Sequence, residues 1–237
     1  MRVISLVPSW TETLIEAGVD VVGRTRYCIH PTERIQKIAV VGGTKNIDIE
    51  KIKTLNPDLV LLDREENTLE ISAALSSFGI PWMATHVVSI ESCTRDLKKM
   101  SEVFDFNSEL LKMKNDYIGI LNSNIFDLGI QSSQFEKINY VIWKKPWMCV
   151  GRNTFIGDVL SRFRIELDLR ENKYFEITET ELKTSYCLFS SEPYPFEKEF
   201  EELKKTGFHG QMIDGENFSW FGVRNLRFMK SLLTDLK

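Results

Sequence analysis

Short apolar runs alternate with helical patterns along the first part of the chain. The apolar runs predict four strands, at residues 3–6, 40–41, 59–62 and 82–85. The helical patterns predict three helices, one from Ser9 to a stop at Gly18, one over 49–55, and one over 68–78. Ser9 and Glu12 also have the spacing of a capping box. Such alternation is typical of parallel strands joined by crossover helices.

Residues 90–124 have a nearly continuous helical pattern with few helix-breaking residues. Its second half, some 18 residues from Asn107, would span about 27 Å, and we expect it to connect two lobes. Two packed helices within one domain would produce the same pattern. Strands are expected again at 138–143, 186–189 and 211–213, and helices at 154–163, 179–183, 197–205 and from Trp220.

The predicted fold class is therefore α/β, with two Rossmann-like lobes that have central, mainly parallel sheets and are joined by a single long helix. We place the N-terminal lobe at 1–106, the connecting helix and linker at 107–134, and the C-terminal lobe at 135–237. At 237 residues the chain is long enough for two modest cores.

Composition narrows the range of partners. The net charge of -4, from 30 basic and 34 acidic residues spread along the chain, argues against nucleic acid as a partner. No apolar run approaches the roughly 20 residues that span a bilayer, so we do not expect a membrane-embedded protein. No export signal is visible, which predicts a cytoplasmic protein as written, or a periplasmic one if the sequence is processed or truncated. Four widely spaced cysteines fit reduced thiols.

Candidate binding residues follow the predicted strands. In open α/β sheets, ligands bind beyond the carboxyl ends of the strands, and the loops expected there are rich in aromatic and charged side chains. We take ten residues as candidate ligand contacts: Trp10, Tyr27, His30, Glu66, Asn67, Trp147, Arg152, Glu192, Trp220 and Arg224. Large rings suit a wide, flat ligand, and guanidinium groups suit its carboxylate, amide or phosphate groups. The rings could equally pack as core, and the arginines could form surface salt bridges.

Metal ligation and catalysis are the alternatives. Cys28, His30 and His86 are weak candidates for metal ligands. Together with Glu66 they include the residue types that usually bind metals, but their spacing is not diagnostic of a metal site. Glu65 and Glu66 could serve acid–base chemistry, although a solvated acidic loop or a docking surface explains them as well. Because no nucleophile elbow, phosphate-binding loop or dinucleotide motif is present, we assign no catalytic residue and no covalent cofactor.

Five stretches together resemble the helical-backbone metal receptor family, the class III substrate-binding proteins related to the cobalamin-binding component of an ABC importer. They are Ser5–Leu14, Val22–Pro31, Val41–Asn46, Ser191–Phe196 and Ser219–Arg224. The resemblance implies two lobes joined by one helix, with cobalamin or a metal–siderophore complex in the cleft between them. By position, Trp10 and Tyr27 would line one wall, and Trp147, Trp220 and Arg224 the other.

The resemblance also implies an ABC permease as a partner, for which Glu70 is the nearest candidate contact in the first lobe. The expected function is thus a binding protein for a corrinoid or similar metal chelate, linked to ABC-type uptake. The alternative is a cytoplasmic metal-dependent enzyme or sensor that uses the region of Cys28, His30 and Glu66.

Overall fold

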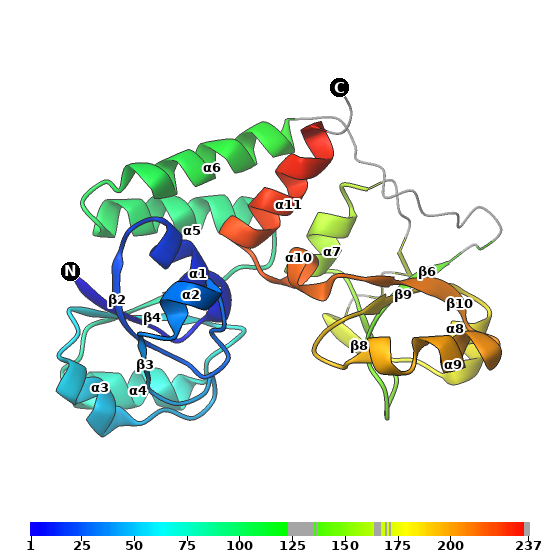
Figure 1. Cartoon of the computed structure of the whole chain (residues 1–237), viewed down its shortest axis with the longest axis horizontal. Coiled ribbons are helices and arrows are strands. Elements are labelled where there is room, and N and C mark those ends of the chain that lie inside the picture. The colour runs from blue at the N-terminus through cyan, green and yellow to red at the C-terminus, as the bar shows by residue number, and fades with distance from the viewer. Residues whose placement is uncertain (123–134, 136, 164–166, 169, 171, 235–237) are drawn as a thin grey trace. The chain divides into compact units, whose positions relative to one another are not determined.

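The computed structural model describes residues 1–122, 135, 137–163, 167–168, 170 and 172–234. The chain divides into two compact units, each with one five-stranded sheet. Unit 1 comprises Met1–Val87, Glu91–Leu121 and Phe221–Arg227. Unit 2 comprises Val88–Ile90, Asn122–Trp220 and Phe228–Lys237. Figure 1 labels the elements of both units along the chain.

The sheet of unit 1 is parallel throughout, in the order β3-β2-β1-β4-β5. Its strands are β1 (Arg2–Ser5), β2 (Asp20–Arg24), β3 (Ala39–Val40), β4 (Leu59–Asp63) and β5 (Trp82–Thr85). The helices are α1 (Pro8–Glu16), α2 (Thr32–Ile35), α3 (Ile49–Leu55), α4 (Leu69–Ser77), most of α5 (Ile90–Val103), α6 (Ser108–Leu121) and the first part of α11 (Val223–Thr234).

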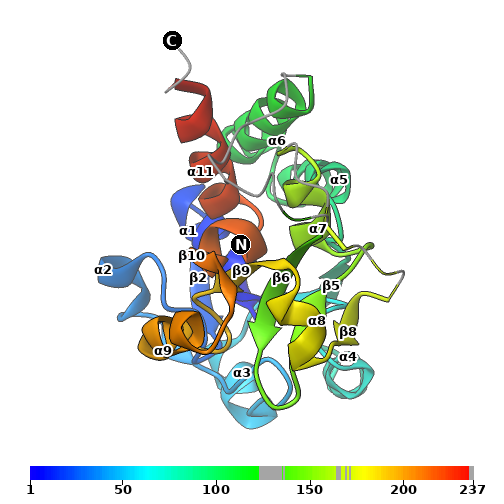
Figure 2. The same cartoon turned by 90° about the vertical axis from the view of Figure 1, so that its right-hand side faces the viewer.

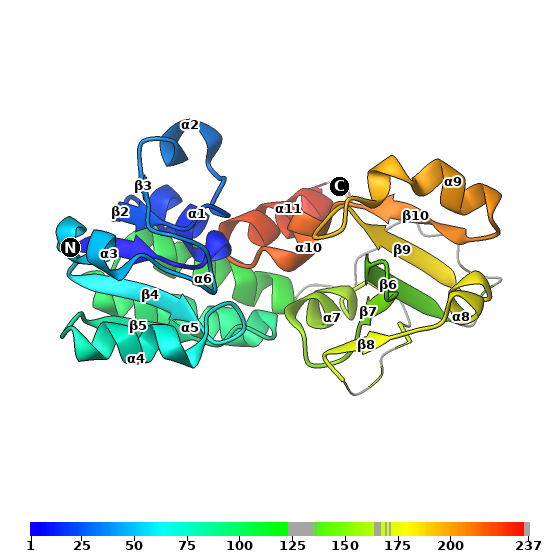
Figure 3. The same ribbon diagram turned by 90° about the horizontal axis from the view of Figure 1, so that it is seen from below.

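Helices cover both faces of this sheet. Figures 1 and 3 show α3 and α4 on one face, and α1, α5 and α6 on the other. Residues from β1, from the position just after it and from β4 pack with α3 and α4 in a cluster that includes Ile4, Leu6, Val60, Leu62, Ile52, Ile71 and Leu75. Because helices flank it on both sides, every residue of β4 is buried, as expected for a central parallel strand.

The sheet of unit 2 is mixed, in the order β10-β9-β6-β7-β8. Its strands are β6 (Ile138–Trp143), β7 (Met148–Val150), β8 (Tyr174–Glu176), β9 (Tyr186–Ser190) and β10 (His209–Ile213). The helices are α7 (Phe155–Leu160), α8 (Glu179–Lys183), the 3-10 helix η1 (Phe196–Lys198), α9 (Phe200–Lys205), α10 (Gly215–Ser219) and the rest of α11. Strands β6, β9 and β10 are parallel, whereas β7 is antiparallel to β6 and β8.

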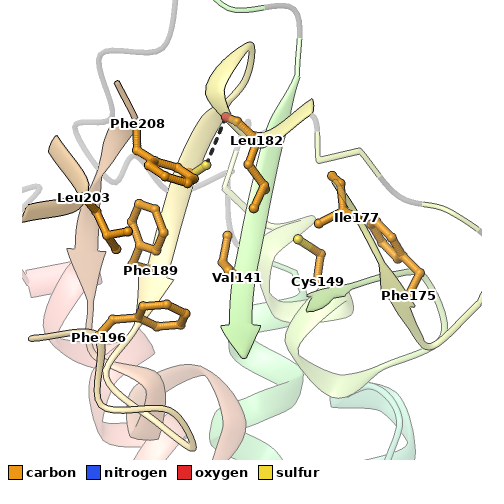
Figure 4. Close-up of a cluster of buried hydrophobic side chains, with 10 residues drawn as sticks. Val141, Cys149, Phe175, Ile177, Leu182, Phe189, Phe196, Leu203 and Phe208 are labelled. Carbon is orange, nitrogen blue, oxygen red and sulfur yellow. Dashed lines mark hydrogen bonds between the residues drawn. The ribbon is translucent and has the colours of Figure 1, made fainter. Parts of the chain in front are cut away.

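Aromatic side chains dominate the core of unit 2. Figures 1 and 2 show α8 and α9 on one face of the sheet and α7 and α10 on the other. On the first face, Val141 and Phe189 pack with Leu182 of α8 and Leu203 of α9 (Figure 4). The dashed line in that view is the hydrogen bond from the Cys187 thiol to the carbonyl of Leu182, 3.5 Å long. Burying a large apolar side chain contributes about 1.5–3 kcal/mol.

The predicted fold class is confirmed, and several boundaries are corrected. The helices at 49–55 and 179–183 have the predicted bounds, whereas β2, β7 and β8 were not predicted. The mainly parallel character holds for unit 1 only, because unit 2 has two parallel and two antiparallel strand pairs.

The predicted capping box at Ser9 and Glu12 is wrong. The first helix begins at Pro8, with Val7 at its N-cap and no side-chain cap, so Ser9 already lies within the helix. Proline suits this first position because its missing N–H group would have had no partner in the helix. The Glu12 side chain is instead bonded to Arg224.

The long helical pattern divides into α5 and α6 at Asp105 and Phe106, which have φ angles of 53° and 56°. These left-handed conformations end α5. The described part of the predicted connecting helix is α6, which belongs to unit 1. Residues 123–134 lie outside the described residues, so the connection and the boundaries of the lobes stay predictions. No helix in the described ranges is both long and apolar enough to cross a membrane.

Candidate functional site

The loops that follow the parallel strands of unit 1 gather at one edge of its sheet. We call Thr25–His30, Val41–Asn46, Arg64–Asn67 and His86 the carboxyl-end loops of unit 1. Asn67 joins three neighbouring parts of this edge. Its side-chain N–H groups donate to the carbonyls of Leu6 (3.2 Å) and Thr44 (2.9 Å), and its Oδ1 accepts from the backbone N–H of Asp63 (2.9 Å).

Asn67 was predicted to contact the ligand, but the structure gives it an internal role. Both donors and the carbonyl of its amide group are already used, and the residue is 9% exposed. The amide therefore holds the loops in place.

Trp10, predicted to line a wall of the site, lies in the interior of unit 1. It is fully buried, its indole N–H donates to the hydroxyl of Thr85 (2.9 Å), and its ring meets that of Phe221 at 4.9 Å. Thr85 in turn donates to the buried carboxylate of Asp63 (2.6 Å). Burial raises the pKa of Asp63, although hydrogen bonds to its carboxylate oppose this effect. Trp10 is part of the core of unit 1.

Three predicted contacts do lie on the carboxyl-end loops and are not fully buried. Tyr27 is 52% exposed, beside the exposed Ile29, and the guanidinium of Arg26 lies 5.3 Å from its ring centre. His30 and Glu66 are half-buried on the same set of loops. These loops thus offer an accessible phenol ring with mixed charges around it.

The metal candidates do not form a site. Cys28 is fully buried, with its sulfur 3.1 Å from the hydroxyls of Thr11 and Thr25, and burial raises the pKa of its thiol. A thiol in this state is a poor metal ligand because the thiolate is the binding form. His86 bonds to Glu65 at 2.9 Å. Among the described residues, no three or more His, Cys, Asp or Glu side chains are grouped to hold a metal ion.

Arg224, which was predicted to meet the ligand from the second lobe, belongs to unit 1 and is paired there with an acidic side chain. Its Nε and a terminal nitrogen donate to the two carboxylate oxygens of Glu12, at 2.9 and 3.0 Å. The Glu12 side chain is only 4% exposed. Both residues belong to unit 1, so the guanidinium neutralises a nearly buried carboxylate within that unit.

In unit 2, an acidic hollow of about 440 Å³ lies where β9 and β10 end. Four carboxylates line it: Glu192, Glu197, Asp214 and Glu216. Of these, only Glu192 was predicted as a contact. The other three could have been identified from the same rule, because Asp214 directly follows a parallel strand and Glu216 and Glu197 stand in the helices beside it.

Two side chains of the same unit hold Glu192 in this acidic hollow. Its Oε1 accepts hydrogen bonds from the hydroxyl of Ser219 (2.6 Å) and the indole N–H of Trp220 (2.9 Å). Trp220, predicted to line the wall, is only 8% exposed, and its indole supports Glu192.

Aromatic residues also gather where β6 and β9 end. Trp143 is 40% exposed, and its ring meets that of Tyr194 at 5.6 Å. Trp147, a predicted contact, is half-buried and stacks on Phe196 with a centroid distance of 6.0 Å. The Tyr194 hydroxyl donates to Glu199, which also pairs with Lys144. We call Trp143, Trp147 and Tyr194 the aromatic platform of unit 2.

Arg152 lies at the opposite edge of this sheet, contrary to its prediction as a site residue. It follows β7, and because β7 runs antiparallel to β6, the end of β7 lies near the start of β6. Exposed Arg152 there lines a separate hollow of about 340 Å³ with Asn153, Thr154 and Asp158. It is therefore away from the aromatic platform of unit 2.

Glu192 should make stability fall as pH rises. Burial raises its pKa above the ordinary value of 4.5, so the folded chain binds this proton more tightly than the unfolded chain. The contribution of Glu192 to the free energy of unfolding is therefore greatest below pH 4.5. It is lost as the pH rises through the pKa that Glu192 has in the folded chain. Urea unfolding from pH 4 to 7 should show Glu192→Gln gaining stability relative to the natural chain as pH increases. Parallel pH profiles for the two proteins would contradict this expectation.

Comparisons with known proteins agree with this arrangement. A family model described as periplasmic binding protein matches residues 3–186. The vitamin B12-binding protein of Salmonella paratyphi A is 37% identical over 100 residues, which are 42% of this chain and 37% of that protein. The matched part thus spans well under half of the curated relative.

Solved structures show the same fold over almost the whole chain. The periplasmic vitamin B12-binding protein of Vibrio cholerae has a TM-score of 0.72 and 17% identity, over 99% of this chain and 96% of its own. The periplasmic heme-binding protein of Vibrio cholerae has a TM-score of 0.77 and 15% identity, over 100% of this chain and 98% of its own. At such identities the likeness concerns the fold alone.

Proposed function

The chain belongs to the periplasmic binding protein family, and from that premise we propose that it binds a bulky metal chelate, with a cobalamin-like corrinoid as the favoured ligand. The family is one of binding proteins, which agrees with the prediction of a protein that is not an enzyme. The relatives of known structure cited above are periplasmic. We propose the same location here and a role in ABC-type uptake, with exposed Glu70 as a candidate contact for the permease.

The observation that carries this proposal is the chemistry of the strand ends in each unit taken by itself. Unit 1 offers the exposed Tyr27 and Ile29, and unit 2 offers its aromatic platform. Large rings supply extensive apolar contact at a low cost in conformational entropy, which suits a wide ligand. Both surfaces lie where ligands bind in open α/β sheets.

The acidic hollow of unit 2 favours a corrinoid over heme. Its carboxylates can accept hydrogen bonds from the amide side chains of a corrinoid. Heme instead carries two propionates, and like charges about 4 Å apart near a protein surface repel by about 4 kcal/mol. The 37% identity to a vitamin B12-binding protein over 100 residues supports the same choice. Nothing in the geometry of Cys28, His30 and Glu66 favours the metal-enzyme alternative.

Equilibrium dialysis against cyanocobalamin, hemin and ferric desferrioxamine tests this proposal. We expect saturable, one-to-one binding of cyanocobalamin and weaker binding of hemin. Replacement of Tyr27 or Trp143 by alanine should weaken cyanocobalamin binding about tenfold, because each removes a ring worth roughly 1–1.5 kcal/mol. Phe106→Ala is the matched control, since Phe106 is 71% exposed at the turn between α5 and α6.

Two results would contradict the proposal. If cyanocobalamin does not bind, the corrinoid assignment fails, and saturable binding of hemin or ferric desferrioxamine would identify a different chelate. If Tyr27→Ala, Trp143→Ala and the Phe106→Ala control all bind alike, the strand ends are not the binding site.

A further inference from the structure

The hydroxyl of Tyr194, in the aromatic platform of unit 2, is held by a carboxylate of the same unit. It donates to Oε1 of Glu199 at 2.6 Å, and Oε2 of Glu199 pairs with Lys144. Three segments meet at this carboxylate, because Lys144 follows β6, Tyr194 follows β9, and Glu199 lies between η1 and α9. Tyr194 is half-buried, so these bonds fix a ring that is still accessible in part.

The hydrogen of this bond belongs to the phenol. Hydrogen bonds from Lys144 and Tyr194 lower the pKa of Glu199, so its carboxyl group is ionised at neutral pH and accepts only. The same bond raises the pKa of Tyr194, which therefore keeps its hydrogen. A phenol has a single hydrogen to donate, and Glu199 takes it. Toward a ligand, the Tyr194 oxygen is left as an acceptor.

The indole of Trp147 is used in the same way. Its N–H donates to Glu179, which also pairs with Lys183 at 2.6 Å. An indole has no other hydrogen-bonding group, so Trp147 offers a chelate its ring surface alone. Neither of these two platform residues presents a donor to a ligand.

The charges around Tyr194 do not reverse this preference. Lys144 pairs with Glu199, so the two charges offset each other. Lys145 also acts on Glu199, but it is exposed, and water and salt screen its charge. Glu192, two positions before Tyr194, is a further acceptor in the acidic hollow. A carboxylate on a ligand therefore finds no donor on Tyr194, whereas an N–H group finds acceptors.

We propose that Glu199 is a specificity-determining residue: by taking the hydrogen of Tyr194, it makes the aromatic platform select chelates whose rim carries N–H donors, such as primary amides, over chelates whose rim carries carboxylates. A carboxylate against the Tyr194 oxygen leaves two acceptors without a hydrogen between them, which is costly in a site that excludes water. The inference rests on the proposed function, and it adds which groups of the ligand are recognised.

Equilibrium dialysis with the full chain compares cyanocobalamin with its monocarboxylic acid derivatives, in which an amide side chain has become a carboxylate. The natural chain should bind at least one derivative about tenfold more weakly than cyanocobalamin. Tyr194→Phe keeps the ring and removes the oxygen. It should weaken cyanocobalamin binding about fivefold and leave that derivative unchanged, so the preference falls to about twofold. Glu199→Ala frees the hydroxyl hydrogen, and it should bind the derivative about fivefold more tightly than the natural chain does.

Adding Tyr194→Phe to Glu199→Ala should remove that gain. If the gain persists in the double variant, the unpaired Lys144 attracts the carboxylate and the proposal is overturned. Glu202→Ala is the matched control, since it breaks an exposed pair with Lys205 on α9, 3.5 Å long, that is not part of the platform. A changed preference in this control would reveal a general effect of surface charge and would also overturn the proposal.

The dialysis distinguishes failure of this inference from failure of the proposed function. If the natural chain does not bind cyanocobalamin, the corrinoid assignment fails, and the role of Glu199 fails with it. If the natural chain binds cyanocobalamin and every derivative equally, or if Tyr194→Phe keeps the full preference, only the role of Glu199 fails.

Discussion

Replacing Arg224 by methionine should lower the free energy of unfolding of unit 1 by about 3–5 kcal/mol. The substitution removes both hydrogen-bonded nitrogens from Glu12 and leaves that carboxylate with 4% of its side chain exposed. A nearly buried carboxylate that loses both of these hydrogen bonds is costly, because its remaining ion pair, with exposed Arg227 at 3.8 Å, is screened by solvent. A complete buried pair contributes little beyond a well-packed apolar substitute. Urea unfolding of the two proteins measures the difference.

The controls for this experiment come from the same helix. Arg227 is 58% exposed, pairs with Glu16 at 2.6 Å and lies 3.8 Å from Glu12. Because Arg227→Met leaves both hydrogen bonds from Arg224 to Glu12 in place, it should cost less than about 1 kcal/mol. The double variant Glu12→Gln with Arg224→Met should recover most of the lost stability, because no buried charge is left. If Arg224→Met kept its stability but lost cyanocobalamin binding, the sequence-based role in ligand binding would be correct.

Replacing Trp10 by alanine should cost about 3–5 kcal/mol of stability, because it opens a cavity in the core of unit 1. Trp10→Phe should cost less, about 1 kcal/mol for the hydrogen bond to Thr85 plus the loss of some packing against Phe221. Thermal and urea unfolding measure both effects. In conditions where the variants are folded, cyanocobalamin affinity should match that of the natural chain.

This comparison separates a core residue from a ligand contact. A tenfold loss of affinity in Trp10→Phe without a loss of stability would show that the ring faces the ligand. Trp143→Ala is the matched variant with the opposite expected result. Because the ring of Trp143 is 40% exposed, its removal should lower the affinity for cyanocobalamin with little loss of stability.

The sequence predicts the fold well where periodicity is strong. The apolar runs at 59–62 and 82–85 locate β4 and β5, and the helical patterns at 49–55 and 179–183 locate α3 and α8. Strands β7 and β8 have only three residues each, too few to show a period. Missing them also hides the antiparallel direction of β7, which is why Arg152 was placed at the wrong edge of its sheet.

The candidate site is predicted less well, for a different physical reason. A tryptophan beside a strand end has the same sequence context whether its ring faces inward, as in Trp10, or outward, as in Trp143. The partner of Arg224 is Glu12, which is 212 positions away, and local spacing carries no sign of such a pair. Exposure and long-range pairing are decided by tertiary packing, so these roles become visible only in the folded chain.

The single amide of Asn67 has a consequence for how tightly a guest can be held. Because it fastens Leu6, Thr44 and Asp63 to one another before anything binds, this edge does not have to become ordered when a guest arrives. Little conformational freedom is then lost on association, which favours slow release. The same rigidity makes the surface selective, since a guest of the wrong outline meets loops that do not adapt to it.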